Sequence, residues 1–92
     1  MRSRVRFLVK GQVQGIGYRF FVLEIAQRLR LEGWVRNLAD GDVEGEAEGE
    51  ADALEDLFRE LKSGHRWAEV ERIETRTIPP LRDPEGLFRI TR

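Results

Sequence analysis

The chain has 92 residues and should form one small domain over residues 1–92, because a chain of this length can bury one hydrophobic core. Apolar residues make up 40% of it and recur periodically, which argues against disorder, while 16 basic and 17 acidic residues disfavour nucleic-acid binding driven by charge. The lack of cysteine excludes disulfides and thiolate metal sites, and the lack of a long apolar segment predicts a soluble, cytoplasmic protein that does not enter a membrane.

The first predicted elements are a strand and a helix joined by glycines. Val5, Phe7 and Val9 alternate with mostly basic residues, which is the period of a half-buried strand. The stretch GQVQGIGYR, from Gly11 to Arg19, leads into the helix. One helix face carries the apolar residues Phe21, Val22, Ile25, Ala26 and Leu29. Gly33 is expected to end this helix, and the pair Phe20 and Phe21 to pack in the core rather than stack on a ligand.

A hairpin is predicted next. Trp34 to Ala39 forms a short strand, and Asp40-Gly41 is a strong turn signal before another strand, from Asp42 to about Gly49. Small apolar residues along this strand alternate with Glu44, Glu46 and Glu48. Such a row could hold a metal ion, but carboxylates on one strand face are more often solvated or paired with basic neighbours. Arg4 and Arg6 are natural partners, and their pairing would make the first and third strands adjacent.

The C-terminal part predicts a second helix and two strands. The spacing i, i+3, i+4, i+7 gives the helix a core-facing stripe of Leu54, Leu57, Phe58 and Leu61, and Gly64 ends it. Trp67 to Ile78 forms a strand. The alternation of its apolar residues changes between Val70 and Ile73, which predicts a bulge there. Asp83 to Gly86 turns the chain, and Leu87 to Thr91 forms a short last strand. The only histidine, His65, is expected in a solvated loop without a metal-binding role.

This order of elements is typical of the α+β ferredoxin-like fold, a split βαβ sandwich of βαββαβ topology, here with a short additional C-terminal strand. It predicts an antiparallel sheet with two helices on one face. Because the first helix runs back along the sheet, the first two strands should point the same way and end at the same edge. Arg19 and Asn37 would then reach one rim from opposite sides of a helix.

The glycine-rich stretch is also a candidate anion site. Glycines accept positive φ, so the backbone can curl with its N–H groups inward, and a helix N-terminus adds unpaired N–H donors. Arg19 would supply a planar guanidinium that can bind phosphate through two parallel hydrogen bonds. Neither common nucleotide-binding motif fits these glycines. A tight turn in which glycines only relieve strain is the alternative interpretation.

Two motifs resemble the signatures of acylphosphatases: GQVQGIGYR the first, and GWVRNLADGDVEGEAEG, from Gly33 to Gly49, the second. The departures, Ile16 for a commoner valine and His65-Arg66 where proline is frequent, leave the matched catalytic positions intact. The resemblance implies hydrolysis of acyl phosphates to a carboxylate and inorganic phosphate without metal or cofactor. It implies that Arg19 binds phosphate and Asn37 orients water. The implied phosphate-binding loop is Gln14, Gly15, Ile16, Gly17, Tyr18 and Arg19.

The residues agree with such chemistry. A carboxylate leaving group, comparable to a side chain of pKa about 4, departs without protonation, so no general acid is needed. The alternative is a non-catalytic ferredoxin-like module that binds a small phosphorylated ligand such as carbamoyl phosphate. RNA binding is disfavoured, because the open sheet face carries arginine and glutamate rather than aromatic residues. We expect a monomer that acts on a small-molecule acyl phosphate.

Overall fold

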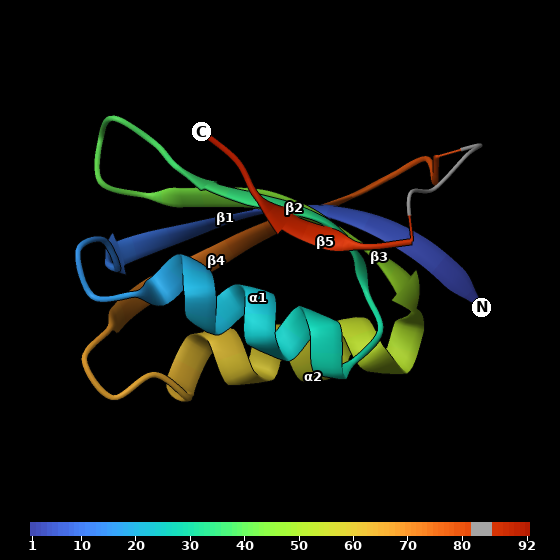
Figure 1. The fold of residues 1–92 in the computed structure, drawn as a ribbon, viewed down its shortest axis with the longest axis horizontal. Coiled ribbons are helices and arrows are strands. Elements are labelled where there is room, and N and C mark those ends of the chain that lie inside the picture. The colour runs from blue at the N-terminus through green and yellow to red at the C-terminus, as the bar shows by residue number, and fades with distance from the viewer. Residues whose placement is uncertain (82–85) are drawn as a thin grey trace.

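The computed structural model describes residues 1–81 and 86–92. Its elements are β1 (Arg2–Gln12), α1 (Tyr18–Arg28), β2 (Glu32–Asn37), β3 (Val43–Glu50), α2 (Ala51–Ser63), β4 (Glu69–Ile78) and β5 (Phe88–Ile90). The strands form one sheet in the order β4-β1-β3-β2-β5, and both helices cover the same face (Figure 1). Four strands pair antiparallel, and β5 adds to β2 in parallel. The predicted ferredoxin-like fold with an additional C-terminal strand is confirmed. None of the described helices is long and apolar enough to cross a membrane.

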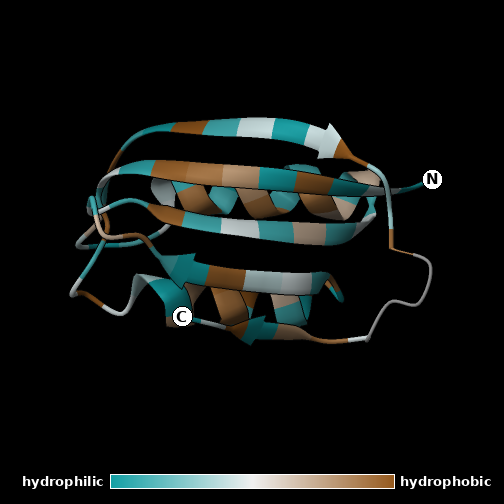
Figure 2. Cartoon of the chain, turned by 90° about the horizontal axis from the view of Figure 1, so that it is seen from above, coloured by the Kyte–Doolittle hydropathy of each residue, from teal (hydrophilic) through white to brown (hydrophobic). Residues whose placement is uncertain are grey.

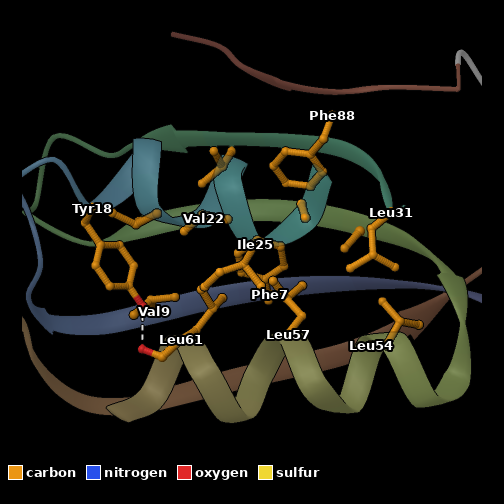
Figure 3. Packing of buried hydrophobic residues seen from close by; sticks show 14 of the residues in the cluster. Phe7, Val9, Tyr18, Val22, Ile25, Leu31, Leu54, Leu57, Leu61 and Phe88 are labelled. Carbon is orange, nitrogen blue, oxygen red and sulfur yellow. Dashed lines mark hydrogen bonds between the residues drawn. The ribbon is translucent and has the colours of Figure 1, made fainter. Parts of the chain in front are cut away.

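The core lies between the sheet and the two helices. β1 is an interior strand, flanked by β3 and β4, and its Phe7 and Val9 are almost fully buried. The helices contribute Tyr18, Val22, Ile25, Leu54, Leu57 and Leu61 (Figure 3). The Phe7 ring meets the Phe58 ring edge-on, with 5.5 Å between centroids. Full burial of one such side chain stabilises the fold by about 1.5–3 kcal/mol, so this layer holds the sheet and helices together.

Two predictions about the first helix are wrong. Phe20 is 64% exposed, because it lies about 200° around α1 from the buried Tyr18 and therefore on the opposite face. Gly33 does not end the helix: α1 ends at Arg28, and Arg30 takes the left-handed φ of 58°. Gly33 instead lies in β2, where a Cβ would clash with the carbonyl oxygen of Glu46 on β3. The glycine is needed for close strand approach.

Strand boundaries differ from the predicted ones by two residues. β2 begins at Glu32 and ends at Asn37, and β4 begins at Glu69. The predicted bulge in β4 is confirmed: Lys10 of β1 pairs with Arg72 whereas Gly11 pairs with Val70, so one residue of β4 is extra. Gly64 follows the last residue of α2, as predicted. Residues 83–85 of the predicted turn lie outside the described part of the chain.

The open face of the sheet, viewed in Figure 2 with the helices behind it, carries a charge ladder formed by Arg2, Arg4, Arg6, Arg36, Glu44, Glu46 and Glu48. Arg4 donates to Glu46 at 2.7 Å and to Glu48 at 3.1 Å. Arg6 donates to Glu44 at 2.9 Å. The predicted adjacency of the first and third strands is confirmed. No group of acidic or histidine residues in the described chain is arranged to hold a metal ion.

Part of this ladder is covered rather than exposed. Arg4 and Glu48 are only 3% and 0% exposed, and the backbone N–H of Leu81 donates to Glu48 Oε1 at 3.0 Å. Burial alone would raise the pKa of Glu48, but the Leu81 N–H and the Arg2 and Arg4 guanidiniums hold it below its ordinary value. A carboxylate with a lowered pKa stabilises the fold above its unfolded pKa, and this contribution is lost as the pH falls through the folded pKa.

We therefore expect acid to remove the contribution of Glu48 to stability. The free energy of unfolding should fall below about pH 4.3, the ordinary pKa of glutamate. Glu48→Gln should be less stable than wild type near neutral pH, and the difference should shrink as the pH is lowered. Urea denaturation of both proteins across this range measures it. A stability difference that stays constant with pH would contradict the role of the ionised carboxylate.

Candidate active site

Two loops meet at one edge of the sheet. β1 and β2 both run antiparallel to β3, so their C-terminal ends point the same way. Figure 1 shows the loop after β1 and the β2–β3 hairpin at the same end of the molecule. Arg19 is the second residue of α1, and Asn37 is the last residue of β2. The topology thus brings residues from two separate motifs to one edge.

The loop between β1 and α1 has the backbone geometry expected of an anion nest. Gly15 and Gly17 have φ angles of 77° and 75°, and Gly17 precedes the first residue of α1. A Cβ built on either glycine would meet no heavy atom within 4 Å. Glycine is therefore required for its conformation, and the space over the loop is open.

The start of α1 leaves its N–H donors available. No side chain caps the helix at Gly17, and its first turn contains no acidic residue. The first N–H groups of a helix have no partner within the helix, and its positive dipole end favours an anion. An external anion can therefore fill the place that a cap or a carboxylate takes in other helices.

A small pocket lies over this loop. Its volume is about 160 Å³, and it is lined by Val13, Gly15, Gly17, Tyr18, Arg19, Phe20 and Asn37. This volume is below the range of about 300–1,000 Å³ typical of drug-sized ligands, and suits a group such as phosphate. Arg19 is half-buried, and within residues 1–81 and 86–92 no carboxylate forms an ion pair with it. The arginines of the charge ladder, by contrast, are already paired.

The comparisons with known proteins identify the family. A family model described as Acylphosphatase matches residues 5–90. The chain belongs to the acylphosphatase family. An acylphosphatase of Koribacter versatilis is 49% identical over 75 residues, which are 82% of this chain and 68% of that protein. One of Moorella thermoacetica is 44% identical over 87 residues, 95% of this chain and 91% of that protein. The crystal structure of acylphosphatase from Bacillus subtilis matches all of both chains with a TM-score of 0.91 and 36% identity.

Most residues of the first acylphosphatase motif line the pocket, but some of their side chains pack in the core. Gly15, Gly17, Tyr18 and Arg19 line the pocket, whereas Ile16 is half-buried and packs against the core. The Tyr18 side chain is buried, and its hydroxyl donates to the backbone carbonyl of Leu61 at 2.7 Å (Figure 3). This burial raises the pKa of the hydroxyl. Tyr18 thus fixes the start of α1 to the last turns of α2.

Three residues near the pocket at the glycine loop have contacts that the sequence did not predict. Val13 and the exposed Phe20 line the pocket. His65, expected to be solvated, packs against the rings of Tyr18 and Phe21, with centroids 5.7 Å and 5.0 Å away. Its Nδ1 accepts a hydrogen bond from the Trp67 N–H at 3.1 Å. Hydrophobic periodicity could not have shown the contacts of Val13 and His65, because both residues lie in loops and periodicity describes helices and strands.

A larger hollow of about 270 Å³ lies on the open face of the sheet. Its lining includes Arg4, Glu32, Trp34 and Glu46. The Arg4 guanidinium there is already bound to Glu46 at 2.7 Å, so its charge is compensated by the protein. The smaller pocket at the glycine loop is the better candidate for binding an anion.

Proposed function

We propose that this chain is an acylphosphatase, which hydrolyses the mixed anhydride of a carboxylic acid and phosphoric acid to a carboxylate and inorganic phosphate. The observation that carries the proposal is the shared pocket of the glycine loop, Arg19 and Asn37. The membership of the chain in the acylphosphatase family supports the same reaction. A non-catalytic module that binds a small phosphorylated ligand would need the loop and Arg19. It would not explain the presence of Asn37 in the pocket, because such a module orients no attacking water.

The loop and Arg19 bind the phosphoryl group in this proposal. Backbone N–H groups of residues 14–19 surround the phosphoryl oxygens at the start of α1. The Arg19 guanidinium adds two parallel hydrogen bonds and a full positive charge. Charge spreads over the equatorial oxygens in the transition state, so donors that are fixed before the reaction stabilise it.

Asn37 orients the attacking water. Its side-chain amide has an acceptor oxygen and two N–H donors, so its oxygen can accept a hydrogen bond from the water and direct the water's lone pair at phosphorus. An amide is too weak a base to remove this proton. We propose that the proton passes to a phosphoryl oxygen of the substrate, and catalysis then depends on positioning rather than on a protein base.

The leaving group sets the class of substrate. A carboxylate is a weak base and leaves without a proton, whereas the alkoxide of an alkyl phosphate needs a general acid. Neither His65 nor any carboxylate is among the residues that line the pocket. The enzyme should therefore act on acyl phosphates and not on phosphate monoesters.

We further propose that the enzyme acts as a cytoplasmic monomer, independently of nucleic acid, metal and cofactor. The edge strand β4 supports the monomer. Half of its ten residues are charged: Glu69, Glu71, Arg72, Glu74 and Arg76. Charges along an edge strand oppose pairing with the edge of a second copy.

The reaction is tested by comparing benzoyl phosphate with an alkyl phosphate, each with and without EDTA. We expect rapid hydrolysis of benzoyl phosphate, very slow hydrolysis of the alkyl ester, and no effect of the chelator. An Arg19→Gln preparation, purified identically, controls for contaminating phosphatases. Comparable rates on both substrates would reveal an overlooked general acid, and loss of activity in EDTA would reveal a required metal.

A further inference from the structure

The side chain of Gln14 connects the phosphate-binding loop to the β2–β3 hairpin. Its Nε2 donates to the backbone carbonyl oxygen of Leu38 at 2.7 Å and to that of Asp42 at 2.9 Å. A side-chain amide nitrogen has two protons, and these two bonds use both. Gln14 is absent from the pocket lining, so its amide serves the hairpin and not the ligand.

The two carbonyls lie at the base of the hairpin. Leu38 N–H donates to the Asp42 carbonyl at 2.8 Å, and Gly41 N–H donates to the Leu38 carbonyl at 3.2 Å. The amide of Gln14 therefore binds to a turn that is already closed by its own backbone. It holds this turn as a unit against the loop that follows β1.

The residues joined by these bonds are neighbours, in the sequence, of the residues proposed to act in catalysis. Gln14 directly precedes Gly15 of the phosphate-binding loop, and Leu38 directly follows Asn37. The bridge thus starts within the proposed phosphate-binding loop, residues 14–19, at one end and lies one residue from the proposed water ligand at the other. The bridge therefore holds the base of the hairpin, next to Asn37, against the loop.

We infer that Gln14 is a positioning residue, which holds Asn37 at the distance from the phosphate-binding loop that places water in line with the phosphoryl group. The inference rests on the proposed roles of Asn37 and the loop. Displacing a catalytic group by about 1 Å can cost about 100-fold in rate. Loss of the Gln14 amide should therefore lower kcat, while the loop and Arg19 still bind phosphate.

The chain offers a matched control at Lys10. Its ammonium pairs with the Asp42 carboxylate at 2.7 Å, so it also ties β1 to the hairpin. This contact reaches only the end of the hairpin that leads into β3 and does not touch Leu38. Lys10→Met removes a neighbouring link, from β1 to the same hairpin, and should leave kcat close to wild type.

The test replaces Gln14 with Met, which keeps the length of the side chain and removes both donors. We expect kcat on benzoyl phosphate to fall about 100-fold, with little change in KM or in the Kd of inorganic phosphate. In an Asn37→Ala background the same replacement should have little further effect on kcat, since Gln14 acts through Asn37. A purely structural role predicts equal losses in both backgrounds.

A second variant, Gln14→Glu, keeps the test decisive if Gln14→Met folds poorly. An ionised carboxylate would face the two carbonyls, and protonation would restore one donor. The kcat of this variant should therefore recover, relative to wild type, as the pH is lowered.

Three results would overturn the inference. They are unchanged kcat in Gln14→Met, equal losses with and without the Asn37 side chain, and a pH profile of Gln14→Glu that follows wild type. If Asn37→Ala itself turns over normally, the role of Asn37 fails together with the inference. A loss in Asn37→Ala without one in Gln14→Met overturns the inference alone.

Discussion

Replacing Asn37 with alanine is expected to lower kcat by about 100-fold or more, because the attacking water would no longer be held in line with the phosphoryl group. Phosphate binding and thermal unfolding should change little. The reason is that the side chain is proposed to contact only the water, while the backbone of Asn37 would still pair with Val43 of β3. Steady-state kinetics on an acyl phosphate, with thermal unfolding followed by circular dichroism, measure both effects.

Arg36→Ala is a suitable control for this experiment. Arg36 adjoins Asn37 in β2, but its guanidinium donates to Glu44 in the charge ladder at 2.6 Å. Its replacement should change stability modestly and leave kcat unchanged. Near-normal turnover in Asn37→Ala would remove Asn37 from the mechanism.

Replacing Arg19 should impair both binding and turnover. The guanidinium is proposed to bind the phosphoryl group in the ground state and in the transition state, so Arg19→Gln should lower kcat and weaken phosphate binding. Charged hydrogen bonds contribute about 1.5–3 kcal/mol each, so the Kd of inorganic phosphate should rise at least 10-fold. Arg19→Lys keeps the charge but loses the planar pair of donors, and should recover only part of either property.

Calorimetry with inorganic phosphate measures the binding part of this prediction. Arg66→Gln is the control, because Arg66 is an exposed arginine whose guanidinium lies 5.8 Å from the centre of the Trp67 ring and does not line the pocket. Its phosphate affinity should equal that of wild type. Equal affinities in wild type and Arg19→Gln would show that phosphate binds elsewhere.

The sequence predicted the strands of this fold and the core-facing side of its first helix, but it placed Phe20 wrongly. Successive side chains of a strand point to alternate faces of the sheet. The apolar residues change from one alternate set to the other between Val70 and Ile73, and this change was enough to locate the bulge in β4. Apolar residues lie on several sides of the first turn of α1. The helical spacing of apolar residues therefore could not show that Phe20 lies outside the core. Its facing follows from the contact of the Tyr18 hydroxyl with the Leu61 carbonyl, 43 residues away.

The pocket could be predicted because it follows from topology. Once β1 and β2 are known to end at the same edge, Arg19 and Asn37 must approach each other. The bridge of Gln14 could not be predicted in this way. Its partners are backbone carbonyls 24 and 28 residues along the chain, and a backbone carbonyl has no residue type that a sequence motif could reveal.

The place of β1 between β3 and β4 has a consequence for how the enzyme becomes active. β1 pairs with β3 and β4, both distant in sequence, whereas the β2–β3 hairpin forms from neighbouring residues. Distant pairings form slowly, since the entropy of closing a long loop is lost before the contacts form. The hairpin alone carries Asn37 but no phosphate-binding loop. In the proposed mechanism, catalysis therefore requires that β1 has docked between its two partners, and a molecule that turns over substrate has completed this slow pairing.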